Sequence, residues 1–226
     1  MTVTIETKVG QIAAEHPLAT RVFARHGIDY CCGGGRPLRE ACREKGVDAV
    51  RVIDEIRNEI REEAPAPGAP SDRWHEAPLG ELVDHILARY HGPLHEELPR
   101  LEAMARKVVA VHRDRDPERL PELLSTYLQL KAELDGHMAK EEQILFPMIQ
   151  RGQGRLAGGP VAVMEHEHDV AGSLLRRLRE LTGDYDVPAE ACNTWRALWH
   201  GLKALEEDMH DHIHLENNIL FPRALA

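Results

Sequence analysis

Two segments of the chain carry the same histidine and glutamate pair in the same setting. One reads HMAKEEQILFP from His137, and the other reads HIHLENNILFP from His212, 75 residues later. In each segment the histidine comes four residues before a glutamate, Glu141 or Glu216. Residues four apart lie on the same face of an α-helix, about one turn from each other. Each segment therefore presents one imidazole and one carboxylate on a common helical face.

Each pair is preceded at a similar distance by a further histidine. His91 lies 46 residues before His137, and His168 lies 44 residues before His212. Pro93 closely follows His91, and a proline inside a helix removes a hydrogen bond and bends the axis. Neighbouring histidines therefore stay open as alternatives. These alternatives are His85 and His95 in the first segment and His166 in the third.

Four histidines and two glutamates form the ligand set of a two-ion metal site. Two divalent ions that share two bridging carboxylates and bind two imidazoles each use this set, and the mixture of donors favours iron. Ferritin-like sites use Glu-x-x-His pairs instead, and the chain lacks the His-Glu-x-x-His pattern of helical zinc peptidases. A zinc-stabilised bundle is the weaker interpretation, because tetrahedral zinc needs no pair of bridging carboxylates.

The composition predicts that helices position these residues. Apolar residues make up 42% of the chain and aromatic residues only 4%, which suits helices packed through aliphatic side chains rather than a sheet. Helical apolar spacing covers four long segments: 79–112, 118–149, 161–181 and 188–220. The sequence therefore predicts an all-α protein with an antiparallel four-helix bundle. The repeated Leu-Phe-Pro segments are expected to be core residues followed by a helix stop.

A proline-rich segment separates the bundle from a smaller domain. Residues 64–73 contain three prolines and a glycine, which cannot continue a helix. We expect a small helical domain over 1–63, a Pro/Ala linker over 64–73 and the bundle over 74–226. Helical patterns in the small domain cover 9–15, 18–26, 38–45 and 50–60.

Charge and cysteine content limit the function classes. The 226 residues include 28 Lys and Arg against 38 Asp and Glu, a formal net charge of −10 without a basic run, so we expect no nucleic-acid partner. No membrane-length apolar stretch or signal-peptide pattern occurs, so we expect a cytoplasmic protein that does not bind membranes. The four cysteines are too few and uneven for a disulfide framework, and Cys42 and Cys192 are expected to be packed thiols.

The adjacent cysteines Cys31 and Cys32 form a separate candidate site. Neighbouring Cα atoms lie about 3.8 Å apart, closer than an ordinary disulfide allows, so a disulfide between them would be strained and easily reduced. The following three glycines leave the sulfur atoms uncovered, and a helix beginning near Pro37 favours thiolates. A redox or ligand role is the favoured interpretation.

These motifs carry a resemblance to a known family. The bundle is similar to a hemerythrin-like domain, and nearly the whole chain resembles the RIC family of iron-sulfur cluster repair di-iron proteins. The motifs behind the resemblance are DYCCGGG from Asp29, KEEQILFP from Lys140, EHD from Glu167 and LEN from Leu215.

The resemblance implies roles for individual residues. It assigns two iron ions per chain, bridged by oxo groups and carboxylates, with Glu141 and Glu216 as the bridges. The implied terminal ligands are His91, His137, His168 and His212. The family's further acidic residues near the metals correspond to Glu133 and Glu167, which are expected to relay protons or to hydrogen-bond to the ligands. Cys31 and Cys32 are expected to supply electrons or to hold a transferred species.

The resemblance also implies a function. A non-haem di-iron protein of this family repairs iron-sulfur clusters damaged by nitric oxide or oxidants in a stress response, binding NO or O2 at the irons or donating iron. Damaged iron-sulfur proteins and an electron donor of unknown identity are the implied partners. A homodimer formed through thiols is a further possible assembly. Whether the protein is an enzyme stays open. The alternative is an NO- or O2-binding sensor module without repair activity.

Overall fold

The computed structural model describes residues 3–16, 18–31, 33–62 and 73–226. Within these ranges the regular elements are all helical, apart from one isolated bridge between Lys8 and Pro37, so the all-α prediction is confirmed. These residues form two compact units, one holding 1–82 together with 210–226 and the other holding 83–209. The predicted linker over 64–73 lies outside the described residues, except for Arg73, which begins α5 (Arg73–Glu76).

Four short helices form the N-terminal part of the chain. They are α1 (Val9–Glu15), α2 (Ala19–Arg25), α3 (Leu38–Lys45) and α4 (Ala49–Glu62). Fully buried aliphatic and aromatic side chains, among them Ile12, Phe23 and Ile56, form its core. Gly46 ends α3 in the left-handed conformation, with φ of 67°, and its N–H bonds back to the carbonyl groups of the last turn. The predicted and observed helices agree to within two residues at each end.

Long helices dominate the rest of the chain. The first stretch is α6 (Leu79–Ile86), a π turn η1 (Leu87–His91) and α7 (Gly92–His112), and the second is α8 (Arg119–Lys140), a π turn η3 (Glu141–Leu145) and α9 (Phe146–Gln150). The third is α10 (Gly158–Thr182), and the fourth is α11 (Asn193–Leu215), a π turn η5 (Glu216–Leu220) and α12 (Phe221–Leu225). Two short 3-10 turns, η2 (Arg113–Arg115) and η4 (Gly154–Leu156), lie in the connections.

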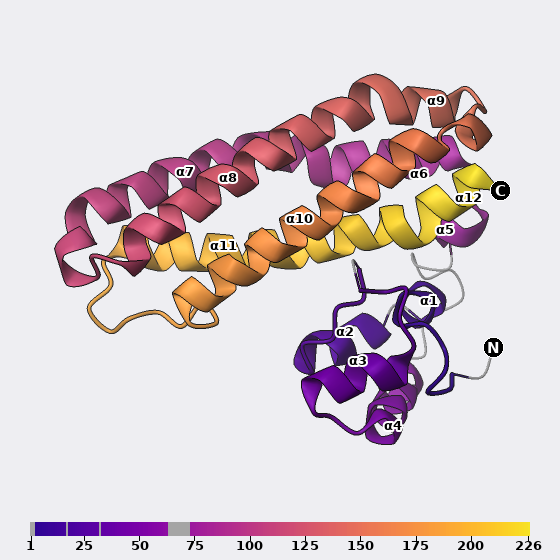
Figure 1. Ribbon diagram of the computed structural model, residues 1–226, viewed down its shortest axis with the longest axis horizontal. Coiled ribbons are helices and arrows are strands. Elements are labelled where there is room, and N and C mark those ends of the chain that lie inside the picture. The colour runs from indigo at the N-terminus through magenta and orange to yellow at the C-terminus, as the bar shows by residue number, and fades with distance from the viewer. Residues whose placement is uncertain (1–2, 17, 32, 63–72) are drawn as a thin grey trace. The chain divides into compact units, whose positions relative to one another are not determined.

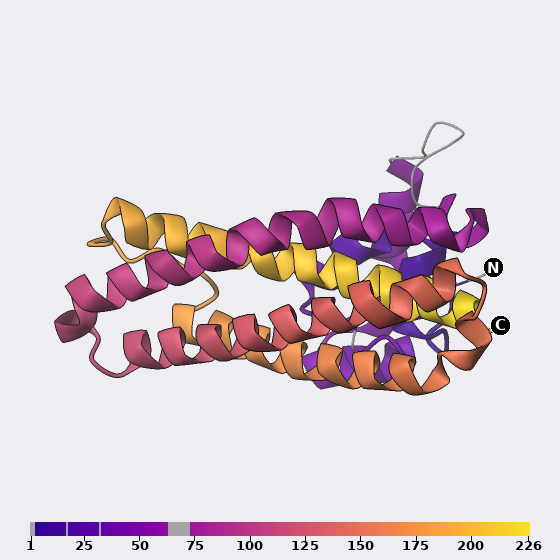
Figure 2. The same cartoon turned by 90° about the horizontal axis from the view of Figure 1, so that it is seen from above.

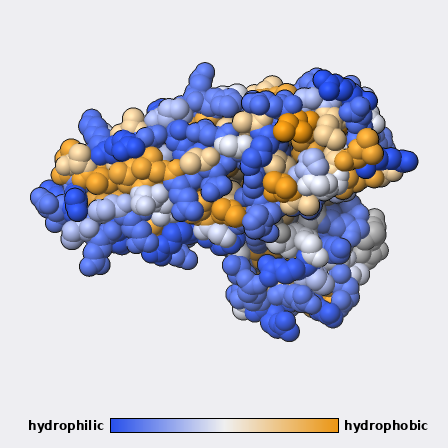
Figure 3. Space-filling view, turned by 45° about the horizontal axis from the view of Figure 1, so that its top comes forward, coloured by the Kyte–Doolittle hydropathy of each residue, from blue (hydrophilic) through white to orange (hydrophobic). Residues whose placement is uncertain are grey.

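Within 83–209 the helices α7, α8, α10 and most of α11 run side by side as a four-helix bundle (Figure 1 and Figure 2). Leucines such as Leu98, Leu101 and Leu130 are fully buried in it. The hydroxyl of Tyr127 in α8 donates to the carbonyl of Leu98 in α7 over 2.8 Å. Hydrophilic side chains cover much of the face drawn in Figure 3, as expected for amphipathic helices. None of the helices in the described ranges combines the length and apolarity needed to cross a bilayer.

The helix stop expected after each Leu-Phe-Pro segment lies three residues beyond the proline. Phe146 and Phe221 are buried as expected, but the helix continues through Pro147 to Gln150 and through Pro222 to Leu225. A π turn precedes each proline. In the first of these turns, the N–H of Phe146 bonds to the carbonyl of Glu141, five residues back. Each proline then lies in the first turn of a new α-helical segment, where its missing N–H costs little.

The start of the fourth helix also differs from the prediction. It begins at Asn193 rather than near Pro188. Three consecutive residues after α10, Gly183, Asp184 and Tyr185, have left-handed φ values of 61°, 58° and 61°. This turn ends α10 and leaves the chain up to Asn193 outside a helix.

Candidate metal centre

The six predicted metal ligands lie at defined points of the long helices. His137, His168 and His212 lie in α8, α10 and α11, whereas His91 ends the π turn η1 and the two glutamates begin π turns η3 and η5. All six side chains belong to residues no more than 3% exposed, and Glu141 and Glu216 are 0% exposed. π turns of this kind often occur at functional sites because the extra residue changes which face the helix presents.

One carboxylate of the unit 83–209 contacts imidazoles from two helices. Oε2 of Glu141 lies 3.4 Å from Nε2 of His91 and 3.3 Å from Nε2 of His137. Nε2 of His168 in turn lies 3.0 Å from Nε2 of His137. The ring of Phe146 packs against that of His91 at a centroid distance of 5.5 Å. A shared carboxylate oxygen between two imidazoles is the arrangement that a bridging ligand needs.

The second His-x3-Glu pair has the same internal geometry. Nε2 of His212 lies 3.0 Å from Oε1 of Glu216. Two overlapping sets of potential ligand atoms lie within 4.8 Å of one another: His91, Glu141, His212 and Glu216, and His137, Glu141, His168 and Glu216. Both glutamates belong to both sets. The first set adds His91 and His212, and the second set adds His137 and His168.

The donor chemistry fits cations of the iron type. Two fully buried carboxylates are unfavourable unless cations compensate their charge. The histidine and glutamate side chains of these sets are donors that iron accepts. Tetrahedral zinc does not require two shared carboxylates.

Two carboxylates outside the ligand sets hydrogen-bond to the ligand imidazoles of His91 and His137. The Nδ1–H of His91 donates to Glu142 over 2.9 Å, and the Nδ1–H of His137 donates to Glu167 over 3.1 Å. Because Nδ1 carries the proton in both rings, Nε2 is the atom left to face the buried glutamates. Glu142 also accepts from His95 over 3.2 Å, and Glu167 is bound by Lys140.

These contacts lower the pKa of both outer carboxyl groups. Burial by itself raises the pKa of Glu142, but hydrogen bonds from His91 and His95 outweigh it and leave the pKa below its ordinary value. Burial likewise opposes the shift at Glu167, where bonds from Lys140 and His137 prevail and lower the pKa. Both groups are therefore carboxylates at neutral pH.

The predicted acidic pair differs from the pair that the structure places beside the ligands. Glu167 contacts His137, whereas Glu133 is exposed and lies outside both ligand sets. The inward stripe of α8 runs through Leu130, Leu134 and His137, which leaves position 133 at the solvent side. Sequence reasoning missed Glu142, although it directly follows Glu141 in the KEEQ segment.

The alternative histidines lie away from the ligand sets. The side chain of His95 is 53% exposed. His166 is exposed, and His85 is half-buried against the ring of Tyr90. The structure thus brings His91 and His168 together with the glutamates and leaves these three histidines outside.

The cysteine segment corrects one expectation about the glycines. Cys31 is only 4% exposed, and its thiol donates to Asp29 over 3.3 Å, while Cys32 lies outside the described residues. The glycines allow close backbone contact instead: the N–H of Gly10 bonds to the carbonyl of Gly34 over 2.8 Å. A Cβ at Gly34 would lie 2.6 Å from the carbonyl oxygen of Tyr30.

The two remaining cysteines have different environments. Cys42 is buried, as predicted, but Cys192 is exposed, which contradicts the expectation of a packed thiol. Cys192 lies just before α11, in the segment that was expected to be helical, and its Sγ lies 3.2 Å from Nε2 of His112.

Comparisons with known proteins agree with this geometry. Residues 82–224 match the hemerythrin HHE cation binding domain, and residues 5–59 match a domain of unknown function, DUF542. The chain is 46% identical over 220 residues to a protein named iron-sulfur cluster repair protein YtfE from Shigella boydii serotype 4, with 96% of each chain covered. The protein of the same name from Escherichia coli O139:H28 has the same identity and coverage.

Proposed function

The chain belongs to the hemerythrin-domain family of iron-sulfur cluster repair proteins, and from this premise we propose that it repairs damaged clusters with two iron ions held by its buried histidines and glutamates. The single observation that carries the two-ion proposal is that Glu141 and Glu216 each belong to both sets of ligand atoms. A lone ion uses one such set, whereas two ions use both and share the carboxylates.

The proposed ligands divide between the two ions. His91 and His212 would hold one ion and His137 and His168 the other, and Glu141 and Glu216 would serve both ions. Bound iron supplies redox chemistry and open coordination positions for small molecules such as NO or O2.

The chain's own groups orient these ligands and control protons around them. Glu142 and Glu167 fix the tautomer of His91 and His137, which keeps each Nε2 directed at the buried carboxylates. Glu167 also binds Lys140, so a proton on the outer side of His137 has a charged route toward the surface. We also propose that Cys31 and Cys32 supply electrons or hold a transferred species, and that Asp29 orients the Cys31 thiol.

Repair is favoured over the sensor alternative, because the relatives that match the whole chain, including the N-terminal domain, are named for repair. Damaged iron-sulfur proteins are thus the partners. NO or O2 as ligands, a separate electron donor, nitrosative or oxidative stress as the setting and a homodimer remain proposals. The cytoplasm as the location is likewise a proposal.

The experiment that tests this function combines metal analysis with cluster repair. Iron per chain is measured for the native protein and for a His212→Ala, Glu216→Ala variant, with His166→Ala, Glu133→Ala as the matched control of exposed residues. Each protein is then added to an iron-sulfur enzyme inactivated by NO. We expect two irons and reactivation for the native chain and the control, and loss of both for the first variant.

Two outcomes would contradict the proposal. Retention of both irons by the His212→Ala, Glu216→Ala variant contradicts the ligand assignment. Reactivation that proceeds equally well without the protein contradicts the repair function, whatever the metal content.

A further inference from the structure

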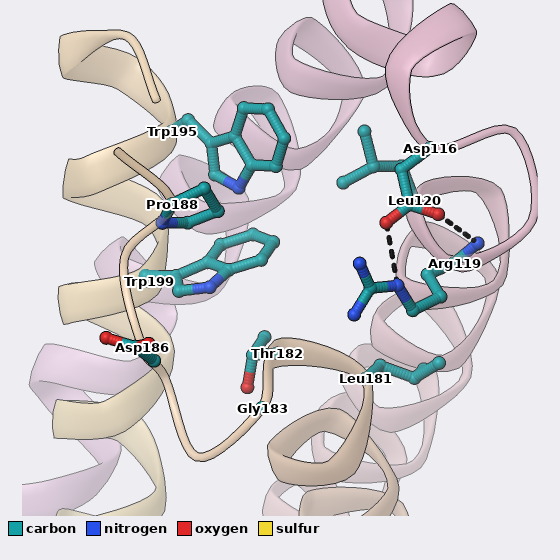
Figure 4. A pocket seen from close by; sticks show the side chains of 10 residues that line it. All are labelled: Asp116, Arg119, Leu120, Leu181, Thr182, Gly183, Asp186, Pro188, Trp195 and Trp199. Atoms are coloured by element: carbon teal, nitrogen blue, oxygen red, sulfur yellow. Dashed lines mark hydrogen bonds and ion pairs between the residues drawn. The ribbon is translucent and has the colours of Figure 1, made fainter. Parts of the chain in front are cut away.

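A pocket of about 240 Å³ lies within the unit 83–209, at the end of the bundle where α8 begins and α10 ends. Its walls come from the start of α8, the turn after α10 and the first turns of α11 (Figure 4). Arg119 in the pocket lies 18 residues before His137 on the same helix, which corresponds to about 27 Å. The pocket is therefore separate from the metal centre.

Two tryptophans give the pocket buried hydrogen-bond donors. Trp195 is 4% and Trp199 is 3% exposed, and neither indole N–H reaches a nitrogen or oxygen acceptor in the part of the chain that the structure describes. Their rings meet edge to face with centroids 5.6 Å apart. A buried donor without an acceptor is unfavourable, so these two N–H groups favour a ligand that carries an acceptor.

Arg119 adds charge on the opposite wall. Its Nε donates to Asp116 over 2.7 Å, and in Figure 4 the two terminal nitrogens of its guanidinium group point across the pocket toward the tryptophans. Asp116 is engaged by this contact and by the backbone N–H of Arg119. The Asp186 carboxylate points away from Arg119 in the same view.

The one hydroxyl group among the lining side chains is already engaged. The hydroxyl of Thr182 shares its hydrogen between the carbonyl groups of Leu178 and Arg179 and accepts from the N–H of Tyr185. The donors of the lining are thus Arg119 and the two indole N–H groups, the Asp186 carboxylate is an acceptor, and Leu120, Leu181 and Pro188 add apolar surface.

We propose that this pocket binds a small aromatic carboxylate. The guanidinium fork of Arg119 matches the two oxygens of a carboxylate, and the indole N–H groups supply further donors. The flat apolar body of such a ligand packs against the tryptophan rings and the aliphatic side chains. A neutral ligand of the same shape forms no ion pair with the terminal nitrogens of Arg119.

Benzoate is the probe that tests the proposal on the full-length chain. The indole N–H resonances of the three tryptophans are followed by NMR during a titration, with Trp74, outside the pocket, as internal control. We expect saturable shifts for Trp195 and Trp199 but not for Trp74. Benzamide, which has the same shape without the charge, is expected to bind at least about tenfold more weakly.

Substitutions locate the binding site. Arg119→Gln is expected to raise the Kd for benzoate about tenfold or more, whereas Arg115→Gln, an exposed arginine outside the pocket, leaves it unchanged. Circular dichroism of both variants checks that the helices are intact. Equal affinity for benzamide, an unchanged Kd in Arg119→Gln, or no saturable shift up to about 10 mM benzoate would overturn the proposal.

Discussion

Replacing Glu142 by glutamine is expected to weaken the binding of one metal ion and to spare the other. Glu142 bonds to Nδ1 of His91, and His91 belongs to only one of the two ligand sets. Glu167 bonds to Nδ1 of His137, which belongs only to the other set. If two ions are bound as proposed, each outer carboxylate serves a different ion, and the two substitutions should act separately.

The size of the effect follows from what glutamine keeps. Carboxylates that hold metal-bound histidines contribute about 10- to 100-fold to metal affinity. The amide oxygen of glutamine still accepts the 2.9 Å bond from His91 and loses only its charge. We therefore expect the lower end of the range, about tenfold for one ion in Glu142→Gln and about tenfold for the other in Glu167→Gln.

Competition with a chromogenic iron chelator measures this effect. The native protein should release its two irons at similar chelator concentrations, whereas each single variant should release one iron early and the other at the native concentration. Glu133→Gln is the matched control, since Glu133 is exposed on α8 outside both ligand sets. Equal loosening of both irons in Glu142→Gln, or the same effect in Glu133→Gln, would refute the reasoning.

Three further predictions concern stability. Gly34→Ala should destabilise the N-terminal part of the chain by about 1–3 kcal/mol because its Cβ meets backbone, while Gly35→Ala, with open space around it, should not; urea unfolding compares the two, and equal midpoints contradict the contact. Tyr185→Phe removes a 2.8 Å bond to buried Glu206 and should cost about 1–2 kcal/mol in thermal unfolding; an unchanged Tm speaks against it. Burial raises the pKa of Asp29, but bonds from the backbone N–H of Gly33 and from Cys31 outweigh it and lower the pKa. The Asp29→Asn variant should therefore be less stable than the native chain above pH of about 4. This difference in stability should vanish as the pH falls through the pKa of Asp29 in the folded protein. A difference in urea midpoint that does not decrease as the pH is lowered from about 4 would contradict the role of the Asp29 charge.

The fold was accessible from the sequence because apolar periodicity and glycine signals act locally. The helices 9–15 and 38–45 were predicted at the residues where they occur. The π turn before Pro147 was not predicted, because a proline is compatible with either a helix end or the first turn of a new helical segment. The choice between them depends on a five-residue backbone hydrogen bond that side-chain patterns do not encode.

The candidate site shows the same division between local and tertiary information. The repeated His-x3-Glu pairs point to residues that the structure brings together, since four-residue spacing fixes a shared face. Glu133 was assigned from the family resemblance, yet it faces solvent, whereas Glu142 reaches His91 from a position one residue beyond a ligand. Which carboxylate reaches a histidine depends on how the helices pack against each other, and single-helix periodicity does not contain that information.

The π turns make one-residue deletions easier to accommodate at three defined places in the long helices. A π turn holds one residue more than an α-helical turn, so deleting one of its residues restores a regular α turn and leaves the residues beyond it on nearly the same face. The places are 87–91, 141–145 and 216–220. The same deletion in a regular α-helical stretch rotates everything beyond it by about 100°. Shortening by one residue is therefore less damaging within these turns than in the α-helices that flank them.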